Sequence, residues 1–459
     1  MGDARQELRV AWDDLLQELS QARDAIDQPE RMPAPQNERN LAEGYRYLLG
    51  FVHSAVERAF HEDPHFPFFR NVLHLINKAT IDNADAIYFA APIDGRRRTR
   101  IYGRVEDHRH WRGNPPAERG RKAPQYLIFE ASQGILAGDS GSLAELRPGL
   151  KTQTGRLDST EIEVDPDGRF EILLAPEPPR GHRGNFISTW RHTTRPNPED
   201  DSHERYANYV SGRQLFYDWE REDPVHLGIE ELGQEGHHPP TYTPEDAAAQ
   251  LRRMGALVRG QMQFWNEFYT VLLEVYGKRD GTSGPRFMPR NAFNQPNAAS
   301  RETGGGQSTN LYAGGVFELA ADEALLVEAQ VAVPPQYMGF HLANLWGESL
   351  DFANHQSSLN GFQVEPDPDG VLRYVVAHRD PGVPNWLDTT GHPEGFLTPR
   401  WSYSETPPEE EWPKISAKKL RFAEIRQHLP EGVRSVSKAE RAERIHVRQR
   451  HVQRRYRVF

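Results

Sequence analysis

The tetrapeptide Asp-Pro-Asp-Gly occurs twice in this chain, at residues 165–168 and 367–370. Proline fixes the backbone at the second position, aspartate hydrogen-bonds within its own turn, and glycine accepts a positive φ, so each copy predicts a tight turn. Each copy lies between segments in which apolar and polar residues alternate, as they do in half-buried strands. Both halves of the chain are therefore expected to contain antiparallel β-structure. The sequence shows no internal repeat of fixed period.

The composition is that of a folded, cysteine-free protein. The 459 residues are 37% hydrophobic and include 9 Trp, 16 Tyr and 21 Phe, which is enough for a large core. The absence of cysteine excludes disulfides, thiolate metal ligands and a cysteine nucleophile. We find neither a signal-peptide pattern nor an apolar run near the roughly 20 residues of a membrane helix. We therefore expect a cytoplasmic protein.

Helical periodicity marks the N-terminal part of the chain. A first helix is expected to bury Leu8, Trp12, Leu15, Leu16 and Leu19 on one face. A second helix is expected to begin near Asn40 and to point Leu41, Tyr45, Leu48, Val52, Val56 and Phe60 inward.

The clearest helix follows Thr243, which is a good N-cap residue. Pro244 suits the first helical position, and Glu245 and Asp246 suit the positive end of the helix. The apolar spacing predicts a helix of roughly 50 Å at ~1.5 Å per residue, ending before Gly277 and long enough to brace two sheets.

These patterns predict an α+β protein whose C-terminal half is an antiparallel, jelly-roll-like β-sandwich. We expect segment 86–90 to form a hairpin with 99–103, segment 356–364 to form one with 372–378, and segment 206–217 to be helical. The chain is divided into N-terminal helices (1–75), a first β-rich region (76–240), the long helix (241–278), a C-terminal β-sandwich domain (279–410) and a basic C-terminal tail (411–459).

The tail is the basic part of an acidic protein. Residues 414–459 contain fourteen Lys and Arg against four Asp and Glu, whereas the whole chain has a formal charge of −11. Such a tail could bind nucleic acid or an anionic membrane. It lacks interleaved aromatic residues for base stacking. We therefore favour a tail that lies along the acidic body of its own or a neighbouring subunit.

Polar side chains concentrate in two windows of the second β-rich region, residues 339–360 and 378–392. In the second window, His378 or His392 is the candidate general acid or base, and Asp388 or Asp380 would orient it. Candidate substrate-binding residues in the two windows are His341, Asn344, Trp346, Asn385 and Trp386. The competing interpretation is that these His and Asn side chains satisfy buried backbone groups.

A divalent metal is a weaker alternative, and no cofactor is evident from the sequence. The candidate ligands are His341, His355, His378 and His392 with Asp351 or Asp388. They lack a close ligand spacing such as HExxH.

The first β-rich region adds three candidates for substrate binding. Asn83 and Asp85 precede a strand, where such residues form Asx-turns or project into a cleft. Arg213 lies in the segment 213–219 and could pair with Asp218 or bind a substrate carboxylate.

Four runs resemble the bacterial family catalogued as domain of unknown function 1214. These are Trp-Gly-Glu-Ser-Leu-Asp at 346–351, the run from Val376 to His392, and the segments 82–88 and 213–219. The resemblance covers most of residues 40–450 and implies a β-sandwich C-terminal half, with some relatives oligomeric. Many relatives carry a companion domain and a signal peptide, neither of which we find here. The family supplies no agreed catalytic residues.

The leading functional hypothesis is an enzyme that acts on a small, mainly apolar metabolite such as a lipid, terpenoid, steroid or aromatic compound. An aromatic-rich cleft between the β-structure and the long helix would hold the substrate. The alternative is a non-catalytic ligand- or carbohydrate-binding β-sandwich with Trp346, Trp386 and Trp401 as a stacking platform. A third hypothesis is a structural subunit of an oligomer. We expect a homo-oligomer whose partner is a small molecule, with no nucleic acid and no membrane.

Overall fold

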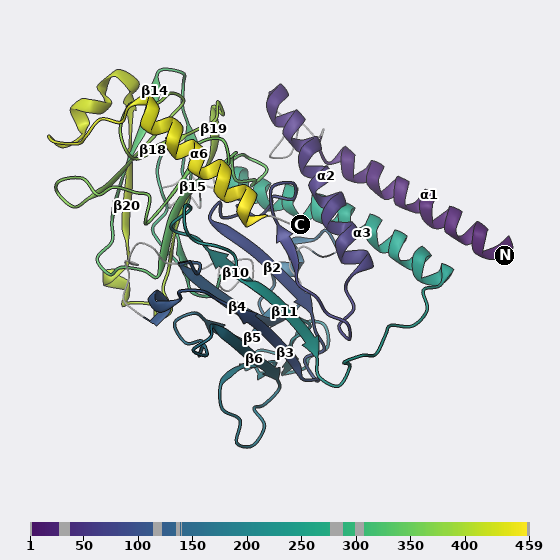
Figure 1. The fold of residues 1–459 in the computed structure, drawn as a ribbon. Coiled ribbons are helices and arrows are strands. Elements are labelled where there is room, and N and C mark those ends of the chain that lie inside the picture. The colour runs from purple at the N-terminus through teal and green to yellow at the C-terminus, as the bar shows by residue number, and fades with distance from the viewer. Residues whose placement is uncertain are drawn as a thin grey trace.

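The computed structural model describes residues 2–26, 37–112, 122–134, 138, 140–275, 288–298 and 307–456. The chain has the expected α+β class, with three N-terminal and central helices beside two β regions and a C-terminal helix lying across the β regions (Figure 1). The expected end of the long helix before Gly277 falls outside the described residues. None of the described helices has the length and apolar character of a membrane span.

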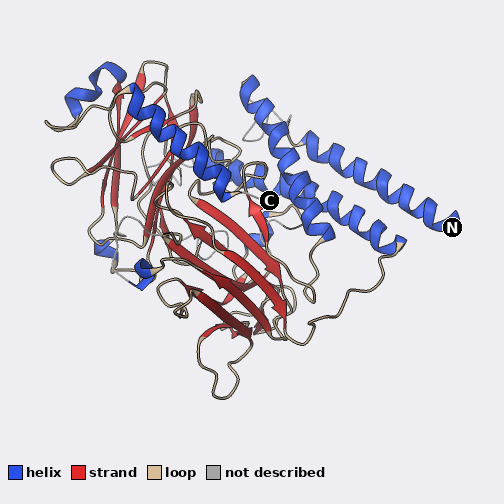
Figure 2. Cartoon of the chain, viewed as in Figure 1, coloured by secondary structure: helices blue, strands red, loops and turns tan. Residues whose placement is uncertain are grey.

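A layer of three helices lies to one side of the strands (Figure 2). It consists of α1 (Gly2–Asp24), α2 (Glu38–Phe60) and α3 (Pro244–Thr270), which continues as a π-helical turn, η3 (Val271–Val275). The predicted start of α3 is confirmed, because the Thr243 side chain accepts from the Asp246 backbone and Asp246 caps Thr243 in return. Short 3-10 helices are η1 (Arg109–Arg112), η2 (Leu143–Leu146), η4 (Glu409–Glu411) and η5 (Phe422–His428).

The buried face of α2 differs from the predicted one. Tyr45, Val56 and Phe60 are exposed, whereas Tyr47 and Phe51 are buried. The buried face is set by small residues: a Cβ at Gly44 would lie 2.6 Å from Trp346, and a Cβ at Gly50 would lie 2.9 Å from a backbone oxygen. The spacing of apolar residues gives no information on which glycines pack against a neighbouring element, so it predicted the wrong face. In α1, Trp12 and Leu16 are likewise exposed rather than buried.

The first β unit, residues 70–231, contains two sheets. The five-stranded sheet has the order β1 (Arg70–Leu73), β2 (Ala86–Pro92), β10 (Tyr209–Leu215), β4 (Tyr126–Gln133) and β5 (Thr152–Asp158). The four-stranded sheet has the order β11 (His226–Glu231), β3 (Thr99–Arg104), β6 (Arg169–Ala175) and β7 (Asn185–Ser188). A small pair, β8 (Trp190–His192) with β9 (Glu204–Tyr206), stands apart. Phe89, Phe129, Ile101 and Ile172 belong to the apolar core that the two main sheets share.

The second β unit, residues 310–421, also contains two sheets. Its five-stranded sheet comprises β12 (Asn310–Tyr312), β19 (Glu394–Ser402), β15 (Tyr337–Ala343) and β16 (Ser358–Asn360), with β13 (Gly315–Glu318) paired to β19 beyond β12. Its four-stranded sheet has the order β18 (Trp386–Asp388), β17 (Leu372–Ala377), β14 (Glu323–Gln330) and β20 (Lys414–Arg421). Phe340, Leu397, Val327 and Val376 contribute to the core of this unit.

The two units share one topology. The order β2-β10-β4-β5 in the first corresponds to β12/β13-β19-β15-β16 in the second, and β11-β3-β6-β7 corresponds to β20-β14-β17-β18. The correspondence includes the two parallel pairs, β6 with β7 and β17 with β18, while the other ladders between named strands are antiparallel. Each Asp-Pro-Asp-Gly turn precedes the equivalent strand, β6 or β17. The chain is therefore an internal duplication, which the sequence did not show as a repeat.

Matching hydrogen bonds confirm this equivalence. Asn185 accepts from the Glu163 backbone and donates to the carbonyls of Glu163 and Glu171. Asn385 makes the same three bonds with Glu365 and Arg373. Both asparagines thus fasten the strand after the turn to the segment before it.

Two expected hairpins are absent from the described strands, because the paired segments lie in opposite sheets. β2 and β3 belong to different sheets of the first unit, and β16 and β17 belong to different sheets of the second. Each strand buries an apolar face in the common core, and placing the two strands opposite one another satisfies both faces. The expected helix at 206–217 is also wrong, because β10 alternates in burial and pairs with β2 and β4 on either side.

The basic tail ends in α6 (Lys438–Arg455), which lies along the body of its own chain, as we favoured. Arg441, Arg448 and Arg455 recur every seven residues and are all buried. Arg441 pairs with Asp380 of the second unit at 2.9 Å, whereas Arg455 donates to the carbonyl of Ala84 in the first unit at 2.7 Å. The helix therefore fastens the two units together.

Candidate functional site

A cavity of about 580 Å³ lies where the helical layer meets the five-stranded sheets of both β units. Helices α2 and α3 supply one wall, β2 and β10 a second, and β12 and β19 a third. A volume of this size lies within the usual range for small-molecule sites.

The walls are mainly aromatic and aliphatic. The apolar and aromatic lining residues are Val72, Leu73, Ile81, Tyr88, Phe89, Leu146, Tyr209, Phe264, Trp265, Phe268, Leu272, Met288 and Tyr312. Such a surface favours an apolar guest through the hydrophobic effect and ring contacts.

The two units present equivalent residues to the cavity. On β10, Arg213 stands opposite Tyr88 and lies over its ring at 5.3 Å. On β19, Arg400 stands opposite Tyr312 and lies over its ring at 5.7 Å. All four residues line the cavity.

The turns before these tyrosines are also equivalent. The backbone N–H of Asn83 donates to the Tyr88 hydroxyl at 2.7 Å, and that of Gln307 donates to the Tyr312 hydroxyl at 2.9 Å. Asn83 and Gln307 both line the cavity. The duplication therefore places two matching Asn/Gln-Tyr-Arg groups around one space.

Most cationic lining residues already have carboxylate partners. Arg58, Arg70 and Arg253 all lie within ion-pair distance of Glu62. Arg213 is paired with Glu130 at 2.7 Å; burial opposes its charge, but Glu130 outweighs this and raises the pKa of Arg213. Such pairing offsets the cost of burying each cation.

Arg400 differs from these residues. It is buried, donates from Nη2 to the carbonyl oxygen of Ile81 at 3.0 Å, and has an Nε without a hydrogen-bond partner. Across the described residues, no carboxylate lies within ion-pair distance of its guanidinium. Arg400 is thus a cavity-lining cation whose charge has no paired carboxylate in the described part of the chain.

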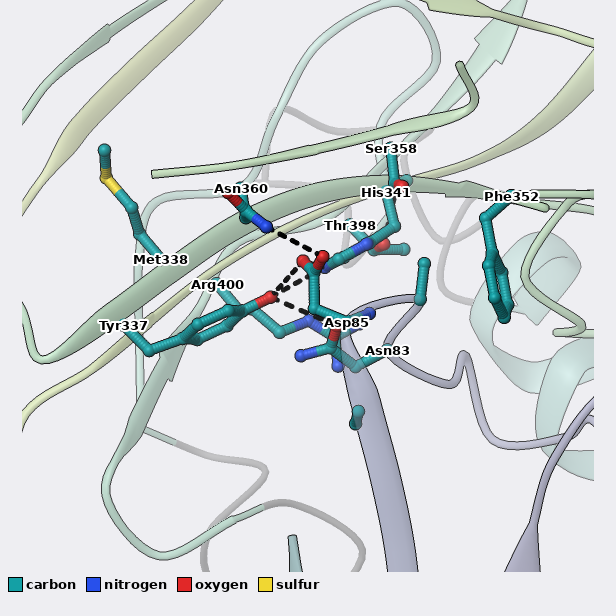
Figure 3. A network of polar contacts seen from close by, with 12 residues as sticks. Asn83, Asp85, Tyr337, Met338, His341, Phe352, Ser358, Asn360, Thr398 and Arg400 are labelled. Atoms are coloured by element: carbon teal, nitrogen blue, oxygen red, sulfur yellow. Dashed lines mark hydrogen bonds and ion pairs between the residues drawn. The ribbon is translucent and has the colours of Figure 1, made fainter. Parts of the chain in front are cut away.

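Behind Asn83 and Arg400 lies a buried polar network centred on Asp85 (Figure 3). Tyr337 donates to Asp85 Oδ2 at 2.6 Å, and the Trp219 indole and Asn360 amide each donate to Asp85 Oδ1 at 3.0 Å. His341 Nε2 lies 3.4 Å from the Tyr337 hydroxyl and 3.9 Å from Asp85 Oδ2. Tyr337, Gly339 and His341 alternate along β15, so they face this network together.

Burial sets the protonation of this network. Burial raises the pKa of Asp85, and the hydrogen bonds from Tyr337 and Asn360 only partly oppose it. Burial, followed by the charge of Arg400, holds the pKa of His341 well below its usual value. His341 is therefore neutral at pH 7.

Four sequence-predicted binding residues are found here. Asn83 and Arg213 line the cavity, and Asp85 and His341 lie in the network behind it. The predicted Asx-turn is confirmed, because the Asp85 N–H donates to the Asn83 side chain at 2.8 Å. The expected pairing of Arg213 with Asp218 is wrong, because β10 is a strand and Arg213 reaches Glu130 on β4.

The four residues predicted to be catalytic lie outside the cavity lining and have other partners. His378 contacts the Thr389 hydroxyl at 2.6 Å and the Leu319 carbonyl at 3.1 Å. The remaining pairs are His392 with Glu43 at 2.9 Å, Asp388 with His355 at 2.8 Å, and Asp380 with Arg441 at 2.9 Å. No acid–base pair of the expected kind joins His378 or His392 to Asp388 or Asp380 among these contacts.

The other four predicted binding residues also have structural contacts. Asn344 donates to Glu43 and Glu348, and the Trp346 indole donates to the Asn40 carbonyl. Asn385 fastens the turn before β17, and the Trp386 indole donates to the Ala377 carbonyl. Trp346, Trp386 and Trp401 are buried, so they form no open stacking platform.

The described residues contain no group of three His, Asp or Glu side chains that could hold a metal ion. The structure therefore offers no ligand set for the metal alternative among these residues. Four further residues line the cavity without having been predicted from the sequence, namely Arg400, Tyr88, Tyr312 and Gln307. One signal was available: Arg400 is the charged residue in the otherwise largely apolar run 396–401.

The fold and the cavity define an α+β protein with two copies of one β unit and a pocket between them and the helical layer. An uncharacterised protein from Burkholderia cenocepacia is similar, with a TM-score of 0.70 and 27% identity, over 92% of this chain and 99% of its own. A protein from Vibrio parahaemolyticus covers 87% of this chain and 100% of its own, but its TM-score of 0.37 and 10% identity are too low to support an argument. No family model and no curated protein matches the chain.

Proposed function

We propose that the protein binds a small, mainly apolar molecule in the cavity between its two β units and its helical layer. The observation that supports this is a space of about 580 Å³ with large aromatic and aliphatic walls, into which asparagine, glutamine and arginine side chains also project. Apolar walls supply affinity, while Asn83, Gln307 and Arg400 would orient the guest by hydrogen bonding. Binding at this place is favoured over carbohydrate recognition on a surface, because the candidate stacking tryptophans are buried.

The test is a titration of the full chain with N-phenyl-1-naphthylamine, a neutral fluorophore that brightens in apolar surroundings. Ala90 shares a strand face with Tyr88 and lines the cavity, so Ala90→Trp should fill the site. Lys418→Trp, at an exposed position of β20, is the matched control. We expect saturable binding by the wild type and the control and about a tenfold loss in Ala90→Trp. Equal binding by all three proteins would contradict the proposal.

A catalytic version of this function is supported by the Asp85 network. A carboxyl of raised pKa next to a neutral imidazole is an arrangement suited to proton transfer. We propose it as the second candidate, with Asp85 and His341 acting through the Tyr337 hydroxyl in place of His378 and His392. Its test is mass spectrometry of a bacterial metabolite extract incubated with wild type or Asp85→Asn. An ion consumed by the wild type alone supports catalysis, and an unchanged extract counts against it.

We also propose that each β unit belongs to the sandwich class. The apolar core between its two sheets supports this, although the pairs β6–β7 and β17–β18 depart from a purely antiparallel jelly roll. Membership of the family catalogued as domain of unknown function 1214 and assembly into a homo-oligomer remain predictions.

A further inference from the structure

We propose that the cavity ligand carries a carboxylate and that Arg400 is its counter-ion. This inference rests on the proposed binding function and adds the chemical class of the ligand. It follows from a comparison of the two β units, in which equivalent arginines have different surroundings.

The equivalence of Arg213 and Arg400 is fixed by strand register. Arg213 pairs across its sheet with Tyr88 on one side and Ile128 on the other. Arg400 pairs with Tyr312 on one side and Gly339 on the other. Glu130 follows Ile128 by two residues, and His341 follows Gly339 by two residues, so each lies on the same strand face as the residue it follows. Glu130 and His341 therefore occupy the same position.

The difference between these two residues removes the counter-ion of Arg400. Glu130 forms an ion pair with Arg213, whereas His341 is buried and its pKa is held well below its usual value. A neutral imidazole cannot balance a guanidinium. The first unit thus supplies its own carboxylate to Arg213, whereas no described residue of the second unit supplies one to Arg400 on the cavity wall.

The surroundings of Arg400 favour a carboxylate as the missing partner. Arg400 is only 6% exposed, and its buried Nε has no hydrogen-bond partner among the residues that the structure describes. Burying an unpaired cation is costly, so an anion that enters the cavity gains a charge-assisted hydrogen bond in a place of low dielectric. A planar carboxylate matches the planar guanidinium. The aromatic walls would hold the apolar remainder of the molecule.

The test compares acids with their own primary amides, which have the same shape and no charge. The probes are 2-naphthylacetate, 4-phenylbutyrate and decanoate with their amides, and 2-naphthyl phosphate as a second anion. Each is titrated at pH 7.5 against the full-length wild type, Arg400→Met and Arg400→Lys, by displacement of N-phenyl-1-naphthylamine. The matched control is Arg205→Met, which removes a buried arginine that lies outside the cavity lining and whose Nε, like that of Arg400, has no hydrogen-bond partner among the described residues. Thermal melts establish that each variant is folded.

We expect at least one acid to bind wild type about ten- to a hundredfold more tightly than its amide. This preference should fall to within about threefold in Arg400→Met, remain in part in Arg400→Lys, and persist in Arg205→Met. Equal binding of acid and amide by wild type, or preference for the phosphate alone, would overturn the carboxylate assignment. Saturable dye binding in the same experiment would still support the cavity as a binding site. If the dye also failed to respond to Ala90→Trp, the proposed binding function would itself be wrong.

Discussion

Arg213 and Arg400 occupy the same strand position in two copies of one β unit, but Arg213 is paired with a carboxylate and Arg400 faces the neutral ring of His341. The duplicated topology explains the equivalence, and the change from Glu130 to His341 explains the different charge balance. The cavity is thus symmetrical in its framework and asymmetrical in its electrostatics. This asymmetry is what gives one end of an apolar site the character of an anion receptor.

His341→Glu should recreate the first unit's ion pair in the second. The new carboxylate is expected to pair with Arg400 and to lower the affinity for carboxylate probes about tenfold, with little effect on the neutral dye. The measurement is the same displacement titration, with a thermal melt to confirm folding. His341→Gln is the control, because a neutral amide should leave the acid preference in place. Unchanged acid affinity in a folded His341→Glu protein would refute the equivalence of positions 130 and 341.

Asp85→Asn should remove one source of pH-dependent stability. Burial raises the pKa of Asp85 above 3.8, so the folded state keeps this proton to a higher pH than the unfolded state. The stability contributed by protonated Asp85 is fully present below about pH 3.8 and is lost as the pH rises through the raised pKa. Asparagine can accept from Trp219 and Asn360 and donate to Tyr337, so the fold should survive.

The measurement for Asp85→Asn is urea unfolding of both proteins at intervals from pH 4 to pH 8. The free energy of unfolding of the variant should rise relative to wild type with increasing pH. A difference that stays constant over this range would show that Asp85 titrates alike in the folded and unfolded chains.

Asn185→Ala and Asn385→Ala should destabilise the protein by similar amounts. Each side chain makes three hydrogen bonds that fasten the strand after an Asp-Pro-Asp-Gly turn. Their loss should lower the free energy of unfolding by about 2–4 kcal/mol in each variant, as urea unfolding would measure. A stable Asn385→Ala protein with altered ligand affinity would instead support the predicted substrate-binding role of Asn385.

Arg448→Ala should loosen α6 from the second β unit. Arg448 is buried and donates to the Phe352 carbonyl at 3.2 Å and to the Ser358 hydroxyl at 3.1 Å. Removing it leaves these buried acceptors unpaired and should cost about 2–4 kcal/mol of unfolding free energy. Arg450→Ala is the control, because the Arg450 side chain is 56% exposed and its change should cost under about 1 kcal/mol. Equal unfolding midpoints for the two variants would contradict a fastening role for α6.

Parts of the fold that depend on neighbouring residues were predictable. The N-terminus of α3 follows from Thr243, Pro244 and Asp246, and the Asx-turn at Asn83 follows from its short side chain and the strand after it. Strands β2, β3 and β17 were also expected close to their observed bounds, although with other partners than those observed. Caps and turns are decided by bonds that span a few residues, and alternation is visible in the strand itself.

The candidate site was predictable only in part. Asn83, Asp85, Arg213 and His341 were singled out for their chemistry, and they do lie in or directly behind the cavity. Arg400 was missed, because its significance depends on Glu130 being absent from the equivalent place. That absence can be recognised only after the two units are superposed by their strand order.

The sequence by itself determined the α+β class, the capped start of the long helix, both Asp-Pro-Asp-Gly turns and the strand segments β2, β3 and β17, because local sterics and hydrogen bonds control these features. The tertiary structure alone decided which strands pair, which face of α2 is buried, that the chain is duplicated, and that Asn83, Arg213 and Arg400 surround one cavity. Those outcomes depend on contacts between residues that lie tens to hundreds of positions apart in the chain. Such contacts are selected by the total burial of apolar surface and the pairing of buried charges, which no short segment encodes.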